Sequence, residues 1–390
     1  MKKNKTIGIL AFAEENGGGV TEFIRSIVEN IEVKSDFNFI IYTNLNEKSF
    51  NSDDRIQIVK VTHNGSSIPK KIFRALSYII PFIPTKFLLS KQEIEVFSES
   101  DYFYCPYISS YPHYFLKRPY FFTLHDLQEY YLYKFFTLKQ HIIRRVLNKA
   151  LLNQAAFVTC ESKFVKNDIV NFFNIEEKKI KIFQAPPSLD YLNFSFNTKV
   201  STQIKLKYNL PNKYFFYPAQ FWKHKNHIRL VKAFHKLSIS YGDIYLVFTG
   251  SEKNILLKLK NEIEVLGLKE KILFLGYIEN EDMPYIYKNS LSLVMPSLFE
   301  SISIPVFEAL TLGVPVISSN VFGLKDQISR AGVLFDPKST KNIYESLLLA
   351  VNNKELLKKN TKIGLSKMKK IRSNFKSDLN RLFRILINEF

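Results

Sequence analysis

The chain of 390 residues contains few cysteines and no long apolar segment. Its two cysteines, Cys105 and Cys160, are too few for a disulfide framework or a metal site, which suits a reducing cytosol. The most membrane-like stretch, Phe73–Leu89, contains charges and prolines, and its uncharged run from Ala75 to Thr85 is too short to span a bilayer. The basic N-terminal residues are followed by an apolar run of strand length and a glycine turn rather than by a cleavage site. We therefore predict no signal peptide. We expect a cytoplasmic protein, soluble or peripheral at the membrane.

The chain also lacks the sequence signatures of nucleic-acid binding. Its formal charge of +19 would suit a phosphate backbone, but neither zinc-finger spacing nor an RNP-type aromatic run is present. Lys is abundant together with Asn, Ile, Phe and Tyr, which is typical of an AT-rich genome. We therefore predict no nucleic-acid partner, and an anionic membrane surface is the better candidate for a basic, aromatic-rich face.

What is present is ample core material arranged in an alternating pattern. Hydrophobic residues make up 46% of the chain and aromatic residues 15%, and the length fits two domains. Short apolar runs alternate with longer amphipathic ones, which indicates parallel sheets covered by helices. The expected strands are Thr6–Phe12, Phe37–Thr43, Ile56–Val61, Tyr102–Pro106, Tyr120–Leu124, Phe157–Cys160, Lys179–Phe183, Tyr214–Pro218, Ile244–Thr249, Lys271–Leu275, Leu291–Met295, Val314–Ser318 and Val333–Phe335. The expected helices are Val20–Asn30, Thr137–Gln154, Ser162–Phe173, Asn226–Leu237, Asn254–Leu266, Met283–Lys288, Pro305–Leu312 and Thr340–Asn352.

The alternation stops between Ala185 and Pro211, where two prolines and several Ser, Thr and Asn residues show no sustained period. The predicted fold class is therefore α/β, with two Rossmann-like doubly wound domains facing a cleft. We predict domains over residues 1–190 and 212–372, with a linker over 191–211. A last helical segment, 373–390, is expected to pack back on the first domain. Ligands of such sheets bind outside the carboxyl ends of the strands, so the functional residues are sought there.

Two candidates follow strands of the first domain. Gly18, in the run Gly17–Gly19, precedes a helix whose N-terminus would favour an anion, although three glycines also make an ordinary flexible turn. His125 ends an apolar strand in FFTLHDL and could bind a sugar hydroxyl or a carbonyl oxygen. A histidine satisfied within its own turn is about equally expected.

The second domain offers a basic segment, YPAQFWKHKNH over residues 217–227. Lys223, His224, Lys225 and His227 lie there beside the single tryptophan, where a helix N-terminus would add positive potential. A segment of this composition is suited to binding a diphosphate. The alternative is a solvated basic loop, which is the usual reading of a run of charges.

Two glutamates, Glu300 and Glu308, flank the junction between a strand and a helix that begins near Pro305. Their pairing suggests either acid/base chemistry or binding of hydroxyl groups. The backbone N–H groups from Ser301 to Ile304 favour the second interpretation, because they would seat phosphate oxygens between the carboxylates. The alternative is a helix-start Glu308 placed by the dipole and a surface Glu300.

Together these segments resemble the retaining GT-B-fold glycosyltransferases of family four, the bacterial polysaccharide-type group 1 enzymes. The family pattern F-E-G-F-G-L-P-x-x-E-A reads FESISIPVFEA here. The resemblance implies that Glu300 contacts the sugar hydroxyls and Glu308 the ribose, that the amides around Ser303 and Ile304 hold the diphosphate, and that Lys225 is the phosphate-binding lysine. It also implies that His125 touches the transferred sugar.

The chain departs from the family pattern at three positions. The family's frequent arginine is Gln220, which would then stand at the phosphate site without a charge. Both glycines between the glutamates are serines, Ser301 and Ser303, so a backbone that needs positive φ there would be strained. The glutamates and Lys225 are unaffected.

The implied function is sugar transfer from a nucleotide-diphosphate sugar to a saccharide or lipid-linked acceptor, with retention at the anomeric carbon. No D-x-D motif occurs, so neither a metal nor another cofactor is expected. A non-catalytic glycosyltransferase-like partner subunit and a GT-B-fold nucleotide-sugar epimerase are the alternatives. The basic, aromatic Pro69–Lys91 could hold a lipid-linked acceptor at a membrane, or could form a buried helix pair.

Overall fold

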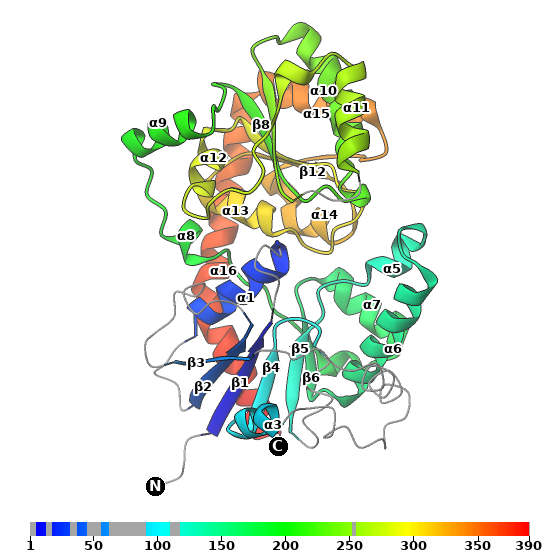
Figure 1. Ribbon diagram of the computed structural model, residues 1–390, viewed down its shortest axis with the longest axis vertical. Helices are drawn as coiled ribbons and strands as arrows, with labels where there is room; N and C mark the ends of the chain where they lie inside the picture. Colours follow the sequence, from blue (N-terminus) through cyan, green and yellow to red (C-terminus); the bar gives the residue numbers. More distant parts are fainter. Residues whose placement is uncertain are drawn as a thin grey trace. The chain divides into compact units, whose positions relative to one another are not determined.

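The computed structural model divides into two compact units, one of Met1–Ala185 with Ser373–Phe390 and the other of Pro186–Arg372 (Figure 1). Each unit contains a parallel sheet with helices on both faces, so the predicted α/β class of two doubly wound units is confirmed. The structure describes residues 5–12, 18–31, 37–44, 56–61, 91–109, 118–251 and 255–389. Nearly all of the predicted acceptor segment Pro69–Lys91, and Gly17, lie outside these residues.

The first unit has a sheet of seven strands in the order β3-β2-β1-β4-β5-β6-β7. The strand order therefore reverses at β1: β2 and β3 lie on one side of it, and β4 to β7 lie on the other. The strands are β1 (Lys5–Ala11), β2 (Phe37–Thr43), β3 (Gln57–Lys60), β4 (Tyr102–Cys105), β5 (Tyr120–Thr123), β6 (Phe157–Cys160) and β7 (Ile180–Ile182). Its helices are α1 (Gly19–Glu29), α3 (Lys91–Ser98), α5 (Gln128–Tyr131), η3 (Tyr133–Phe135), α6 (Leu138–Gln154), α7 (Lys163–Phe173) and η4 (Glu177–Lys179).

Both faces of this sheet are covered, because alternate side chains of each strand enter different cores. Ile7 and Ile9 of β1 enter a core with α1, whereas Leu10 enters a second core with α3, α6 and α7. The first core also contains the end of α16 (Lys354–Asn388), where Phe383 packs against Phe39, Tyr104 and Phe121. The last residues of the chain are thus part of the first unit's core.

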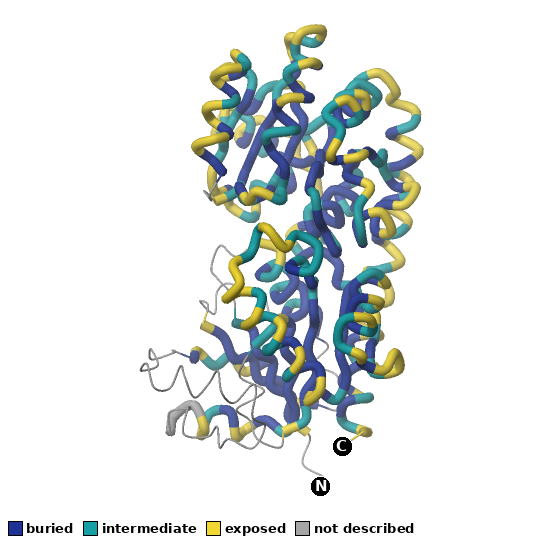
Figure 2. Tube along the Cα trace, turned by 90° about the vertical axis from the view of Figure 1, so that its right-hand side faces the viewer, coloured by how far each residue is buried: buried dark blue, intermediate teal, exposed yellow. Residues whose placement is uncertain are grey.

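The second unit has six parallel strands in the order β10-β9-β8-β11-β12-β13. The strand order reverses at β8, whose neighbours are β9 and β11, and ligand crevices of doubly wound sheets lie at such a point. Figure 2 shows the strands of both units as buried cores with exposed helix faces around them. The strands are β8 (Tyr214–Pro218), β9 (Tyr245–Thr249), β10 (Ile272–Phe274), β11 (Ser292–Met295), β12 (Val316–Ser319) and β13 (Val333–Phe335).

The helices of the second unit form two groups. Helix α10 packs against α11 and α15, whereas α12 packs against α9 and α13 (Figure 1). Within the described residues, no helix is both long enough and apolar enough to cross a membrane. The helices are α8 (Leu189–Leu192), α9 (Thr198–Lys207), η5 (Lys223–Lys225), α10 (His227–Ser240), α11 (Leu256–Val265), η6 (Lys269–Lys271), α12 (Met283–Asn289), α13 (Ile304–Leu312), α14 (Phe322–Ile328), η7 (Ser329–Ala331), α15 (Thr340–Asn352) and α16.

The segment 191–211, predicted as a linker, differs from that expectation. It belongs to the second unit and contains α9, whose first turn is capped because the Asn197 side chain accepts hydrogen bonds from the Lys199 and Val200 amides. Ser201 of α9 is also hydrogen-bonded to Asn289 of α12. The caps and contacts, rather than an apolar period, define this helix. Helix α14 was likewise not expected.

Candidate functional site

Lys225 and Glu300 form an ion pair at the point where the second sheet reverses its strand order. Lys225 ends η5, which follows β8, and Glu300 lies in the loop between β11 and α13. Because β8 and β11 are parallel neighbours, both loops leave the same edge of the sheet. Lys225 Nζ lies 2.6 Å from Glu300 Oε1, and the two side chains are 20% and 10% exposed. The structure thus brings together two of the three predicted catalytic residues.

A set of hydrogen bonds holds these two loops together. The Tyr217 hydroxyl donates to the Lys225 carbonyl oxygen at 2.8 Å, and the Leu298 amide donates to the His224 carbonyl oxygen at 2.8 Å. The Asn226 side chain donates to the carbonyl oxygens of Pro296 and Pro337, both at 2.9 Å. Asn226 itself has φ 61°, a left-handed conformation that asparagine tolerates, and it directs the chain into α10. The Lys225 backbone is therefore fixed before any ligand binds.

The two histidines of the basic segment do not add positive charge. Burial, followed by the charge of Lys225, lowers the pKa of His224 and of His227 to about 3. His227 is completely buried, and its ring contacts Tyr217, Phe221 and Phe248. His227 is therefore a core residue and His224 is partly buried, and the segment's cations are its two lysines.

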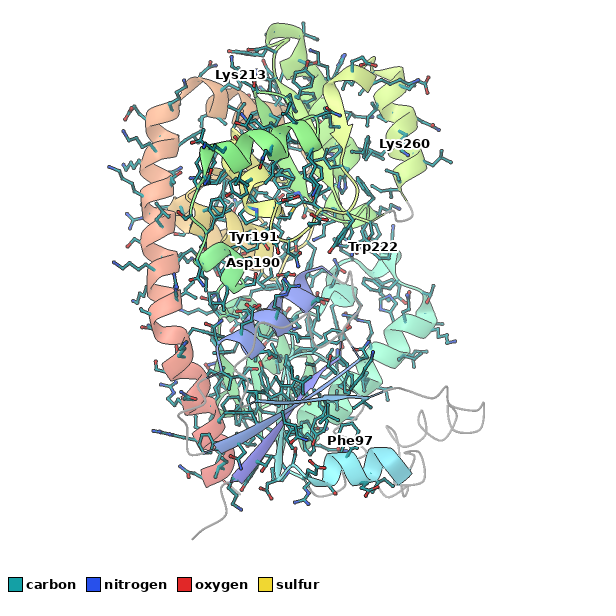
Figure 3. All side chains as sticks on the ribbon, turned by 60° about the vertical axis from the view of Figure 1, so that its left-hand side comes forward. Phe97, Asp190, Tyr191, Lys213, Trp222 and Lys260 are labelled. Carbon is teal, nitrogen blue, oxygen red and sulfur yellow. The ribbon has the colours of Figure 1, made fainter. Side chains whose placement is uncertain are left out.

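Gln220 occupies the loop after β8 and accepts a hydrogen bond from Trp222 Nε1 at 2.8 Å (Figure 3). This loop passes directly over Gly250, which follows β9. A Cβ on Gly250 would lie 2.6 Å from the Ala219 carbonyl oxygen, and the residue has φ +134°. A side chain at position 250 would therefore displace the loop.

The loop between the glutamates does not require glycine. Ser303 has φ −130°, and Ser301 is not among the described residues with positive φ, so the serines that replace the family glycines are accommodated. However, the Ser303 amide already donates to Gln327 Oε1 at 2.8 Å, while Gln327 Nε2 donates to the Ser303 carbonyl oxygen at 2.7 Å. The expectation that the Ser303 amide binds diphosphate therefore needs correction. The Ser303 hydroxyl is a better candidate donor to a phosphate than the amide, because it is buried without a partner among the described residues.

Glu308 lies on α13, as the sequence indicated, and Ile304 also belongs to this helix, which begins one residue before the predicted start at Pro305. Ile304 is the first residue of this helix, where backbone N–H groups lack partners within the helix. Glu308 is buried, and its Oε2 accepts a hydrogen bond of 2.6 Å from the Tyr287 hydroxyl of α12. The Glu308 carboxylate is thus oriented by a neighbouring helix rather than exposed at a helix start.

The remaining predicted residues, His125 and Gly18, belong to the first unit. His125 Nδ1 lies 2.7 Å from Glu161 Oε2, and Nε2 lies 2.8 Å from the Pro106 carbonyl oxygen. Burial lowers the pKa of His125, but the hydrogen bond and charge of Glu161 and the Pro106 carbonyl raise it by more, so the net pKa lies above 6.5. Both ring nitrogens face oxygen acceptors, an arrangement that favours the doubly protonated ring. His125 is thus satisfied by partners beyond its own turn.

Gly18 is the residue before α1 and has φ 70° and ψ −141°. Glycine adopts such a conformation without the steric cost that a Cβ adds. The chain therefore enters α1 in a conformation that favours glycine, and the predicted role of Gly18 in binding an anion stays a prediction. Glycine at this position provides no side-chain cap for the helix.

Three residues of these clusters were not predicted from the sequence: Tyr287, Gln327 and Glu161. Each contacts a predicted residue from another element, at separations of 21 to 36 positions along the chain. Glu161 alone had a usable signal, because it follows strand β6 just as His125 follows the neighbouring strand β5. Tyr287 and Gln327 lie within helical segments that carry no such positional signal.

The two doubly wound sheets define an α/β protein, and comparison with known proteins shows which family part of the chain matches. Residues 201–366 match the family model described as glycosyl transferases group 1. The match covers less than half of the chain, and it agrees with the resemblance to the group 1 glycosyltransferases found in the sequence.

Individual proteins agree with this assignment. The chain is 29% identical over 234 residues to the O-antigen chain mannosyltransferase B of Escherichia coli, and the match covers 58% of this chain and 60% of that relative. A glycosyltransferase structure from Rickettsia africae aligns with TM-score 0.69 at 17% identity, covering 99% of this chain and 98% of the other. The Anabaena protein HepE, in complex with UDP and glucose, aligns with TM-score 0.75 at 14% identity, covering 96% and 98%. These structural matches confirm the GT-B glycosyltransferase fold.

Proposed function

We propose that the chain is a retaining hexosyltransferase that moves a sugar from a nucleotide-diphosphate sugar to a saccharide or lipid-linked acceptor. The Lys225–Glu300 pair at the reversal point of the second sheet carries this proposal, since it places a cation and a hydroxyl-binding carboxylate in one ligand crevice. The mannosyltransferase relative supports a hexose and a role in surface polysaccharide or glycan synthesis. The complex of HepE with UDP supports a nucleotide donor.

The chemistry requires stabilisation of the departing nucleoside diphosphate. The bond from the anomeric carbon to the phosphate oxygen breaks, the acceptor oxygen forms the new bond on the same face, and a phosphate oxygen takes the acceptor proton. Lys225, the N-terminus of α10 and the Ser303 hydroxyl would stabilise the phosphate charge by preorganised electrostatics. Glu300 would accept hydrogen bonds from the sugar and Glu308 from the ribose, so neither needs to act as the base.

We propose a part for His125 as a doubly protonated ring. Both of its ring nitrogens already donate to Glu161 and Pro106, so the ring has no lone pair for a sugar hydroxyl. It would act on the transferred sugar through its positive charge and its exposed ring edge, 15% of the side chain being accessible. This differs from the hydrogen-bonding role that the sequence suggested.

We also propose that catalysis needs no metal or other cofactor. Lys225 beside Glu300 would supply positive charge of the kind that a divalent ion would otherwise provide. In the described part of the chain, the structure contains no cluster of three or more His, Cys, Asp or Glu residues that could hold an ion. Activity that is unchanged by a chelator and not increased by Mg²⁺ or Mn²⁺ is expected. The proposed location is the cytoplasm, where both buried cysteines stay free thiols.

Ligand binding and product analysis test the function in two stages. We expect UDP or GDP, and the corresponding sugar, to raise the melting temperature of the wild type but not of Lys225→Ala. Lys260→Ala, in which an exposed lysine of α11 is removed (Figure 3), is the matched control and should respond like the wild type. NMR of the product should then show the anomeric configuration of the donor.

Each rival function predicts a different outcome. Release of a free epimerised nucleotide sugar without an acceptor would show an epimerase. Absence of binding by any nucleotide would identify a non-catalytic partner subunit. A product with the inverted anomeric configuration would still indicate a transferase but would overturn the proposed retention.

A further inference from the structure

The outward face of helix α6 is apolar, which is unusual for a surface helix. Leu138, Ile142 and Ile143 are 67%, 55% and 50% exposed, and Tyr133 in the preceding turn is 60% exposed. The inward side is buried at three other positions. A helix on the surface of a globular protein normally turns polar residues to the solvent, so this apolar face suggests a binding partner.

The same face is basic. Lys139, Arg145 and Lys149 are exposed, and the sequence from 138 to 154 contains no Asp or Glu. Within the described part of the chain, none of these three cations belongs to an ion pair. Arg144, by contrast, is paired with Glu129 at 2.9 Å and with Asp126 at 3.1 Å. Three positive charges thus lie among the apolar side chains without a compensating carboxylate.

We propose that this surface, formed by Tyr133, Leu138, Ile142 and Ile143 with Lys139, Arg145 and Lys149, binds an anionic lipid bilayer. A helix with an apolar face and interspersed Lys and Arg lies in the plane of a membrane interface, and tyrosine is favoured at that depth. The positive charge selects this occupant, because a second copy of the chain would bring two basic faces together. The inference deepens the proposed function, on whose lipid-linked acceptor it rests, but it can be tested without any substrate.

Co-sedimentation with vesicles tests the surface directly. Wild type should sediment with vesicles of phosphatidylcholine containing about a third phosphatidylglycerol, and much less with pure phosphatidylcholine or at high salt. Replacing Lys139, Arg145 and Lys149 by Gln should weaken binding about 100-fold, at roughly fivefold for each cation. Ile142→Gln with Ile143→Gln should weaken it at least about tenfold.

Matched controls come from helix α11, which also has exposed lysines and an exposed leucine. Leu257 is 75% exposed, and Lys258 and Lys260 are exposed beside it. Replacing these three residues by Gln should leave vesicle binding unchanged. All variants should keep the melting temperature shift with nucleotide, so failure of this proposal is distinguishable from failure of the proposed function.

Insertion depth can be followed with a single label. Both native cysteines are completely buried, and burial raises the pKa of the Cys160 thiol to about 12, so an added surface cysteine is labelled selectively. An environment-sensitive dye on Ile142→Cys should shift to shorter wavelength on anionic vesicles, whereas the same dye on Lys260→Cys should not. No shift at position 142, vesicle binding that survives both α6 variants, or a dimer that these variants dissociate would each overturn the proposal.

Discussion

Lys225 Nζ and Glu300 Oε1 lie 2.6 Å apart and join the loops that follow β8 and β11. The two residues are 75 positions apart in the chain, yet the parallel pairing of β8 with β11 brings their loops to one edge of the sheet. A lysine held by a carboxylate is preorganised for a phosphate that approaches from the same side. The ion pair therefore holds the residues proposed to bind the diphosphate and the sugar in a fixed relation to each other.

Lys225→Gln should reduce kcat/KM for the donor by about 10²- to 10³-fold, because a preorganised charge at the leaving group is lost. Glu300→Gln should cause a loss of similar size through the sugar hydroxyls. Since the two side chains touch, the double variant should lose less than the product of the single effects. Steady-state kinetics of the four proteins test this, with circular dichroism to show that each is folded. Fully multiplicative losses, or near-normal turnover of Glu300→Gln, would contradict the coupled role.

Much of the fold could be predicted because the strands are short apolar runs with distinct boundaries. Every described strand overlaps a predicted one, from β1 to β13. Helices that depend on caps or on long-range contacts were not predicted, such as α9 with its Asn197 cap. Helix α16 was predicted only in its last part, as the segment 373–390 that contains the buried Phe375 and Phe383, whereas its mostly polar start from Lys354 was not predicted.

In the candidate site, too, some residues could be predicted from the sequence and others could not. Lys225, Glu300 and Glu308 could be placed from the sequence because they follow strands or start helices. Their partners could not, because hydrogen bonds such as that of Tyr287 to Glu308 depend on the packing of α12 against α13. Composition was also misleading at His224 and His227, which the sequence places in a basic cluster but whose pKa values are lowered to about 3.

Gln327→Leu should destabilise the loop between the glutamates. The Gln327 amide satisfies both the N–H and the C=O of Ser303, and both pairs are buried. Leaving two buried backbone groups unpaired should lower the free energy of unfolding by about 2–4 kcal/mol. Urea denaturation measures this loss, and Asp326→Asn, an exposed change on the same helix, should stay within about 0.5 kcal/mol of wild type. Equal stability of the two variants would show that the Ser303 contacts contribute nothing.

Tyr287→Phe should weaken donor binding more than turnover. Its hydroxyl donates to Glu308 at 2.6 Å, and the carboxylate is buried, so removing this donor leaves Glu308 less well oriented for the ribose. We expect the Kd for the nucleotide to rise about 5- to 30-fold, which corresponds to roughly 1–2 kcal/mol. Isothermal titration with the nucleotide and with its 2′-deoxy analogue measures the effect. If Glu308 binds the ribose, Tyr287→Phe should lose most of the wild type's preference for the ribonucleotide over the 2′-deoxy analogue. An unchanged preference would contradict that role.

The pair of His125 and Glu161 should make the stability of the first unit depend on pH. Because the folded-state pKa of His125 is raised above 6.5, the contribution of the pair is fully present below pH 6.5 and is lost as the pH rises through the raised pKa. The stability of wild type should therefore exceed that of His125→Gln most clearly at pH 6 and least at pH 9. His224 and His227, whose pKa values are lowered, destabilise the fold as the pH falls, but they are common to both proteins and cancel in the difference. Urea denaturation at pH 6, 7.5 and 9 measures it, Glu161→Gln should remove the same pH dependence, and a constant difference would argue against the charged pair.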